Sequence, residues 1–279
     1  MHETSRTAEA AGLRWHVQVV EVAPQRPWVL LLHGTGASTH SWRGLAPLLA
    51  PQLNLIAPDL PGHGFTPALP GAGMSLPGMA AAIAALLKAM QRQPALIVGH
   101  SAGAAIAIRL ALDGLPVRGI VGLNAALLPL GGFAGRVFSP AARLLARSRW
   151  VPRLFARRAA DPAVVKRLIA STGSRLDDEG VALYGRLVAD PAHAAGALAM
   201  MANWDLERFA ADLPRLGVPL TLIVGSNDRT LPPQQSRDVQ AMLPGATFTS
   251  LPGLGHLAHE ERPDLVAPLI LDAARAACG

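Results

Sequence analysis

Six short apolar runs, separated by stretches with helical character, constrain the fold of this chain more than any other feature. Short continuous runs of this kind, followed by glycine, proline or small residues, are typical of strands buried in a parallel sheet. The alternation predicts a doubly wound, mostly parallel α/β sheet. The six predicted strands are Trp28–Leu32, Leu53–Ala57, Ala95–Gly99, Gly119–Asn124, Leu220–Gly225 and Thr247–Leu251. The predicted helices are His40–Ala50, Ser75–Gln91, Ala102–Leu112, Pro233–Leu243 and Asp264–Ala277.

The alternation stops between Leu127 and Trp204, where amphipathic helical segments occur without a convincing strand. We interpret this stretch as a helical cap inserted into the α/β domain. The predicted division is a first part of the core at 1–126, the cap at 127–205 and a second part of the core at 206–279. A chain of 279 residues, 51% of them hydrophobic, is long enough to bury such a core. An early stretch, Arg14–Val22, is interpreted as an antiparallel edge strand pair or its remnant.

The pentapeptide Gly99-His100-Ser101-Ala102-Gly103 lies where a predicted strand passes into a predicted helix. This is the context of a G-x-S-x-G nucleophile elbow, a turn so tight that the serine backbone is strained. Its neighbours two residues away must be small, so that strand and helix can approach each other. We therefore predict that Ser101 is a nucleophile. The alternative is an ordinary glycine-rich turn.

A serine nucleophile needs a base and an orienting carboxylate, in the chain order serine, acid, histidine for this kind of elbow. Asp228 and His256 each follow a predicted strand, and the carboxyl ends of such strands collect functional groups. We predict the catalytic triad Ser101–Asp228–His256. His259 competes for the role of base, but we expect it to lie in the helix that follows and not in the loop. The alternative position for the acid, after Gly119–Leu123, holds Asn124, which cannot stabilise an imidazolium as an anion does.

Two backbone N–H groups are predicted to form the oxyanion hole. One belongs to Ala102, the residue after the nucleophile, and the other to Thr35 in the loop His33-Gly34-Thr35-Gly36. His33 is interpreted as a structural hydrogen-bonding residue, because the triad already has its histidine. Asp59 and His63, in a Pro-Gly-His-Gly turn, are interpreted as loop architecture.

Several other chemistries find no support in the sequence. It contains no P-loop lysine motif, no H-E-x-x-H and no paired C-x-x-C, so we expect no metal site and no cofactor. The lone cysteine, Cys278, excludes an intrachain disulfide. The net charge is +6, but the sequence contains no motif that would indicate binding to nucleic acid. We find no secretory signal and no membrane span, and expect a cytoplasmic protein.

Basic charge is concentrated in the predicted cap, where Asp161 is the only acid between Gly131 and Arg175. Apolar residues are interleaved with this charge, as in helices with one apolar and one cationic face. A solvated surface packed on the core would explain the pattern. So would peripheral docking on anionic lipid, recruitment of an acidic protein, or capture of a hydrophobic ligand that carries carboxylates. For such contacts we select Arg143, Arg147 and Trp150.

Five segments are diagnostic: 33–37, 40–44, 57–66, 74–79 and 98–105. Together they resemble the α/β-hydrolase-fold magnesium-chelatase accessory proteins of bacteriochlorophyll biosynthesis. The elbow and the Pro-Gly-His-Gly turn belong to the whole superfamily, so the resemblance depends mainly on His40–Gly44 and Met74–Met79. An aspartate is absent from the nucleophile position, which argues against the relatives that cleave halides and epoxides with a carboxylate.

The resemblance implies an α/β-hydrolase fold and a link to the insertion of magnesium into protoporphyrin. Protoporphyrin is a flat apolar ring that carries two propionates, and it therefore suits a cap that is both apolar and arginine-rich. The implied partners are a tetrapyrrole and magnesium-chelatase subunits, with peripheral contact at the inner membrane. Two functional classes stay open: a serine hydrolase that cleaves an ester or related acyl bond, and a non-catalytic module that binds a tetrapyrrole or the chelatase.

Overall fold

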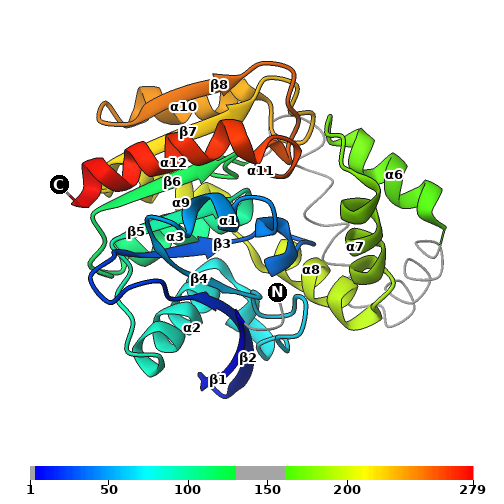
Figure 1. The fold of residues 1–279 in the computed structure, drawn as a ribbon, viewed down its shortest axis with the longest axis horizontal. Helices are drawn as coiled ribbons and strands as arrows, with labels where there is room; N and C mark the ends of the chain where they lie inside the picture. Colours follow the sequence, from blue (N-terminus) through cyan, green and yellow to red (C-terminus); the bar gives the residue numbers. More distant parts are fainter. Residues whose placement is uncertain (1–3, 130–160, 279) are drawn as a thin grey trace.

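The computed structural model describes residues 4–129 and 161–278, and an eight-stranded sheet forms its centre (Figure 1). The strand order is β1-β2-β4-β3-β5-β6-β7-β8. β1 and β2 pair antiparallel, as do β2 and β4, while every other pair is parallel. The strands are β1 Ser5–Ala10, β2 Leu13–Val20, β3 Trp28–Leu32, β4 Asn54–Pro58, β5 Leu96–His100, β6 Gly119–Leu123, β7 Leu220–Gly225 and β8 Thr247–Leu251.

All six predicted strands are present, with bounds that differ from the prediction by one residue at most. The antiparallel pair predicted within Arg14–Val22 is wrong in its extent, because this stretch contains the single strand β2, and its antiparallel partner at the sheet edge is β1, which was not predicted. Ala11 and Gly12 connect the two strands with φ angles of 53° and 72°. Positive φ at both central residues is the geometry of a two-residue turn that matches the twist of a hairpin.

Side chains of alternating direction in β3 enter two separate cores, one on each face of the sheet. Val29 and Leu31 pack with residues of α1, α11 and α12, whereas Leu30 and Leu32 pack with residues of α2, α3 and α10. Helices on both faces are the arrangement that continuous apolar strands require. The bounds are α1 Ala46–Leu49, α2 Leu76–Ala89, α3 Ala102–Leu112, α9 Leu206–Asp212, α10 Pro233–Met242, α11 Ala258–Glu261 and α12 Pro263–Cys278, with short 3-10 turns η2 Thr39–Trp42, η3 Gly71–Met74 and η4 Leu213–Arg215.

The single helix predicted over His40–Ala50 is wrong. The segment instead forms η2 and the four-residue helix α1, with a break between them. Gly44 lies in the break, where a side chain would come within 3.1 Å of Pro263. Pro47 then begins the next turn, and because proline lacks an N–H it cannot continue a helix from before Gly44. The helix predicted over Ser75–Gln91 is confirmed as α2, and the Ser75 hydroxyl caps it by accepting from the Gly78 N–H.

Within the described part of the predicted cap, three helices and no strand are found: α6 Pro162–Ser171, α7 Asp178–Val188 and α8 Pro191–Asn203. Figure 1 shows α6 and α7 beside the sheet, on neither of its covered faces. An aspartate caps each helix by accepting from a backbone N–H of the first turn, namely Asp161, Asp177 and Asp190. The division into core and cap stays a prediction. No described helix has the length and apolar character needed to cross a lipid bilayer.

Candidate active site

Ser101 occupies a strained turn between β5 and α3. Its φ and ψ angles are 50° and −117°, and its N–H donates to the Leu123 carbonyl over 2.9 Å. Both flanking glycines are required, because a Cβ at Gly103 would lie 2.1 Å from the Leu32 oxygen and one at Gly99 would lie 2.5 Å from Ala104 backbone atoms. A strained serine at the point where a strand enters a helix is the geometry of a nucleophile elbow.

Asp228 follows β7 and His256 follows β8, and the structure brings the two side chains together. His256 Nδ1 lies 2.8 Å from Asp228 Oδ2. The other carboxylate oxygen, Oδ1, accepts from the N–H groups of Thr230 at 2.8 Å and Leu231 at 2.9 Å. Both side chains are buried. With Nδ1 donating to the carboxylate, Nε2 of His256 is the nitrogen that can accept a proton.

The elbow lies beside this pair. The ring of His100, the residue before the nucleophile, is 4.9 Å from the ring of His256, and His100 Nε2 lies 2.9 Å from the His256 carbonyl oxygen. This contact joins the loop after β8 to the end of β5, so the predicted base and the predicted nucleophile belong to adjoining parts of one site.

His259, the competing base, lies in α11 as predicted, and its ring is fully buried. It packs against Trp42 at 5.0 Å and His100 at 4.4 Å between ring centroids. Neither ring nitrogen has a hydrogen-bond partner among the described residues. Burial lowers the pKa of His259 to about 3, so the ring is neutral. Asp228 is therefore paired with His256 and not with His259.

Asn124 makes a contact that the sequence did not reveal. Its Nδ2 donates to Asp228 Oδ2 over 2.7 Å and to the Gly255 carbonyl over 3.3 Å. The residue follows β6 with a φ of 44°, at the position considered above for an alternative acid. Asn124 thus supports the carboxylate that it does not replace. Its place at a strand end is the one signal in the sequence that could have selected it.

The two predicted oxyanion-hole donors lie on either side of the nucleophile. Ala102 is the first residue of α3, and Thr35 lies in the loop after β3. This loop packs closely on the elbow, since a Cβ at Gly34 would lie 3.0 Å from the Ser101 Cβ and 2.8 Å from His100 Nδ1. Neither the Thr35 nor the Ala102 N–H donates to an acceptor within the described ranges.

His33 and Asp59 brace the loops around the site, as predicted. His33 Nδ1 lies 2.8 Å from the Gly34 oxygen, and Nε2 accepts from the Leu60 N–H over 2.9 Å. Burial lowers the pKa of His33 to about 4, which keeps it neutral. The Asp59 carboxylate accepts from the N–H groups of Thr39 and Phe65, and lies 2.8 Å from His16 Nδ1. The His63 ring is buried in the same turn.

Three predicted ligand contacts, Arg143, Arg147 and Trp150, lie outside the described residues. In the described ranges, no group of three or more histidine, cysteine or acidic side chains could hold a metal ion.

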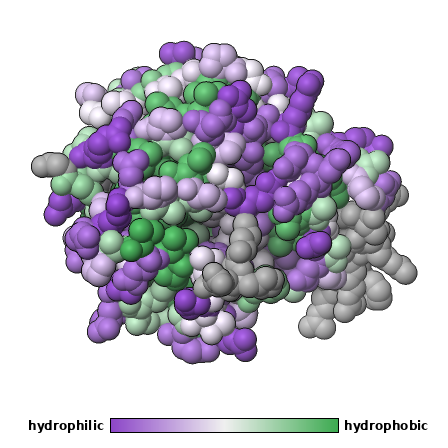
Figure 2. Space-filling model, in the orientation of Figure 1, coloured by the Kyte–Doolittle hydropathy of each residue, from purple (hydrophilic) through white to green (hydrophobic). Residues whose placement is uncertain are grey.

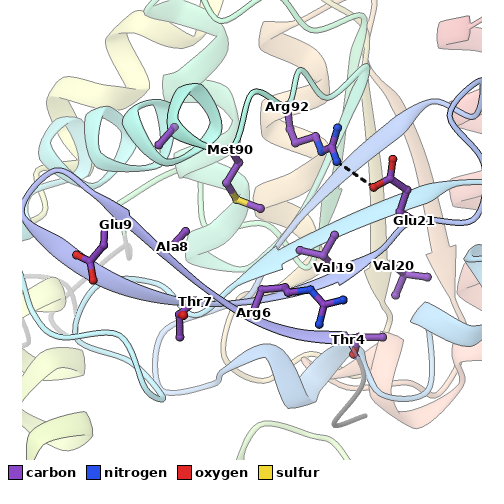
Figure 3. Close-up of a pocket in the computed structure, with 11 residues that line it drawn as sticks. Thr4, Arg6, Thr7, Ala8, Glu9, Val19, Val20, Glu21, Met90 and Arg92 are labelled. Atoms are coloured by element: carbon purple, nitrogen blue, oxygen red, sulfur yellow. Dashed lines mark hydrogen bonds and ion pairs between the residues drawn. The ribbon is translucent and has the colours of Figure 1, made fainter.

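A cavity of about 690 Å³ lies far along the sheet from the triad, between the β1–β2 hairpin and the end of α2, and the Arg92–Glu21 ion pair lies at its wall (Figure 3). It contains none of the predicted site residues. Figure 2 shows one face of the molecule, on which small hydrophobic areas are scattered among hydrophilic residues.

Comparison with known proteins places these features in context. The model of the α/β hydrolase family matches residues 29–269. The chain is 42% identical to the magnesium-chelatase 30 kDa subunit of Rhodobacter capsulatus, across 91% of this chain and 89% of that protein. It is 30% identical to pyrrolizixenacetamide deacetylase of Xenorhabdus hominickii, across 85% and 87%. The solved structure of the epoxide hydrolase CorEH aligns with a TM-score of 0.81 over 98% of this chain and 99% of that chain; at 22% identity this likeness shows the fold alone.

Proposed function

This chain belongs to the α/β-hydrolase family and, within it, to the group that contains the magnesium-chelatase 30 kDa subunit, and from this premise we propose that it is a serine hydrolase. One observation carries the proposal. Ser101 lies on a strained elbow, and His100, the residue before it, packs against the ring of His256, whose Nδ1 is hydrogen-bonded to Asp228. A fold kept only for binding has no need for a strained serine beside an oriented imidazole.

The proposed reaction is acyl transfer. His256 Nε2 takes the proton of Ser101 as its Oγ attacks the carbonyl carbon of an ester or related acyl bond. The oxygen of the tetrahedral intermediate accepts from the N–H groups of Ala102 and Thr35. His256 then returns the proton to the leaving group, and the acyl chain stays on Ser101. Water, deprotonated by the same imidazole, attacks this ester and releases the acid and free Ser101.

Asp228 keeps the imidazole in the tautomer that these proton transfers require. Its Oδ2 accepts from Nδ1, which leaves the Nε2 lone pair facing the reaction. The imidazolium that forms during attack is stabilised by the same carboxylate. The hydrogen bonds from Thr230 and Leu231 hold the carboxylate in place.

The biological setting follows from the relative with 42% identity, whose name is that of a magnesium-chelatase subunit. We propose that the chain serves magnesium insertion into a tetrapyrrole, with chelatase subunits as partners and a tetrapyrrole as ligand. Arg143, Arg147 and Trp150 would supply cationic and aromatic contacts to an apolar ring with carboxylates. Fluorescence titration with protoporphyrin tests this part. We expect saturable binding that weakens in the double variant Arg143→Glu/Arg147→Glu but not in Arg118→Glu, a charge reversal at an exposed position before β6.

The name of that relative also favours a second candidate, a non-catalytic module that binds a tetrapyrrole or the chelatase. Labelling with a fluorophosphonate separates the two. We expect covalent labelling of the wild type, its loss in Ser101→Ala, and its retention in Ser250→Ala, which removes an exposed serine of β8. A wild type that is not labelled, together with chelatase support that survives Ser101→Ala, would establish the binding module instead.

A further inference from the structure

One face of α8 contacts the loops that flank the nucleophile. His193, Gly196 and Met200 are spaced three and four residues apart, so they project from the same side of the helix. His193 and Met200 contact the loop after β3 that contains Thr35, and Gly196 contacts the turn after β4. This helix belongs to the predicted cap, yet its buried face meets the part of the core that would stabilise the tetrahedral intermediate.

His193 uses both of its ring nitrogens on backbone groups of two different loops. Nδ1 accepts from the Gly64 N–H over 3.0 Å, and Nε2 lies 3.1 Å from the Gly36 carbonyl oxygen. Because Nδ1 is an acceptor, the ring carries its proton on Nε2 and donates it to Gly36. The side chain is 3% exposed. A neutral ring of defined tautomer therefore joins the loop after β3 to the turn after β4.

Gly196 and Met200 extend this contact along the helix. A Cβ at Gly196 would lie 1.9 Å from the Gly62 oxygen, so the helix backbone rests directly on that turn. The Thr35 hydroxyl donates to the Met200 sulfur over 3.4 Å. Thr35 is thus held through its own side chain, and its neighbour Gly36 through His193. The Thr35 N–H that we assign to the oxyanion hole therefore belongs to a loop that α8 contacts at two points, the Thr35 hydroxyl and the Gly36 carbonyl.

We propose that His193 is a positioning residue that fixes the Gly34–Gly36 loop so that the Thr35 N–H is aimed at the reacting oxygen. The inference rests on the proposed function, because it assigns Thr35 to the oxyanion hole of a serine hydrolase. His193 itself does not touch the reacting atoms. Its effect passes through the Gly36 carbonyl, and a preorganised donor is worth more to the transition state than to the bound substrate.

The test compares His193→Ala and His193→Gln with Ala195→Gln, a change at an exposed position of the same helix. The substrate is p-nitrophenyl butyrate. For His193→Ala we expect kcat to fall about 10- to 100-fold with KM within about twofold of the wild type. Glutamine can restore the donor to Gly36, so His193→Gln should recover part of kcat. Ala195→Gln should leave both constants unchanged.

A second readout separates positioning from general destabilisation. Phenylboronic acid forms a tetrahedral adduct with a catalytic serine, and one boronate oxygen occupies the oxyanion hole. Its affinity should fall with kcat in His193→Ala and recover in His193→Gln, while thermal unfolding shows that the variants are folded. If His193→Ala does not fold, the Gln variant carries the test through its kcat and boronate affinity, which should still lie below the wild type.

The outcomes distinguish a failure of the proposed hydrolase function from a failure of the positioning role of His193. A wild type that neither hydrolyses the ester nor reacts with a fluorophosphonate would defeat the proposed function. A reactive wild type whose folded His193 variants keep kcat and boronate affinity within about twofold would defeat the positioning role alone. Equal losses in the His193 and Ala195 variants would do the same.

Discussion

The amide of Asn124 donates to the same oxygen of Asp228 that accepts from His256, over 2.7 Å and 2.8 Å respectively. With the N–H groups of Thr230 and Leu231 on the other oxygen, four donors surround one buried carboxylate. Such charge-assisted hydrogen bonds fix the orientation of the carboxylate. The residue at the alternative acid position therefore supports the carboxylate that we propose as the catalytic acid.

Asn124→Leu should weaken that support. It removes one donor to a charged group, an interaction worth about 1.5 to 3 kcal/mol, so we expect kcat for p-nitrophenyl butyrate to fall about 10-fold or more. The control is Asn203→Leu, which removes an exposed amide of α8 that bonds only to its own helix. Equal kcat values for the wild type and Asn124→Leu would show that the contact does not orient the carboxylate.

Exchange of the two side chains tests whether a carboxylate at residue 124 can serve the same histidine. Asp228→Asn alone should lower kcat about 10,000-fold, because the imidazole loses its tautomer and its counter-charge. Because the two side chains are within hydrogen-bonding distance, Asp228→Asn/Asn124→Asp returns an anion to the site. We expect the double variant to recover at least about 10-fold over Asp228→Asn. The absence of any recovery would argue that His256 can be oriented only from the end of β7.

Glu260 should make the stability of the protein depend on pH. Its side chain is buried and accepts from the Tyr184 hydroxyl over 2.6 Å, and burial raises its pKa from 4.5 to about 8. Between these values the folded state binds more protons than the unfolded state, so the free energy of unfolding falls as pH rises, by up to about 1.4 kcal/mol per pH unit. Above about pH 8 the effect ends.

Glu260→Gln has no such group, so the wild type should lose stability relative to the variant between pH 5 and pH 8 in urea denaturation. The buried histidines contribute the opposite slope below pH 6.5, because burial lowers the pKa of His40 and His259 to about 3. Both histidines are present in the two proteins, and their contribution lies below the pH range in which Glu260 is expected to dominate. Parallel stability curves would contradict the assignment to Glu260.

Gly103→Ala should damage the elbow itself. The added methyl group would lie 2.1 Å from the Leu32 oxygen, so α3 would have to move away from β3. We expect a loss of about 3 kcal/mol or more in the free energy of unfolding, and loss of fluorophosphonate labelling. Gly217→Ala is the matched control, because no atom lies within 4 Å of its added Cβ, and its effect should stay within about 0.5 kcal/mol. Similar unfolding curves for the two variants would show that the elbow tolerates the displacement.

Local patterns were sufficient to predict the parts of the structure that depend on short stretches of chain. β3 and β7 have the predicted bounds because a continuous apolar run between turn residues specifies a buried strand. The helical pattern of His40–Ala50 does not produce one continuous helix, because η2 and α1 are separated at Gly44. A single helix is interrupted here because Gly44 packs against Pro263, and because Pro47 has no N–H to bond to the preceding turn.

The sequence was sufficient to predict that Ser101, Asp228 and His256 follow the ends of strands. Contacts between distant segments could not be predicted in this way. The Asn124 amide and the Asp228 carboxylate are 104 residues apart, and His193 bonds to Gly64 across 129 residues. Neither pair leaves a periodic signal, because a hydrogen bond between loops depends on how the sheet and helices are assembled.

Ser101 and Asn124 stand at the ends of two adjacent strands, and both hold left-handed backbone angles that only glycine adopts without cost. Glycine at either position would relax the backbone, but it would remove the hydroxyl in one case and the amide in the other. Selection for a more rugged protein and selection for reactivity therefore pull these two positions in opposite directions. A stabilised relative would be expected to show its loss of chemistry here first.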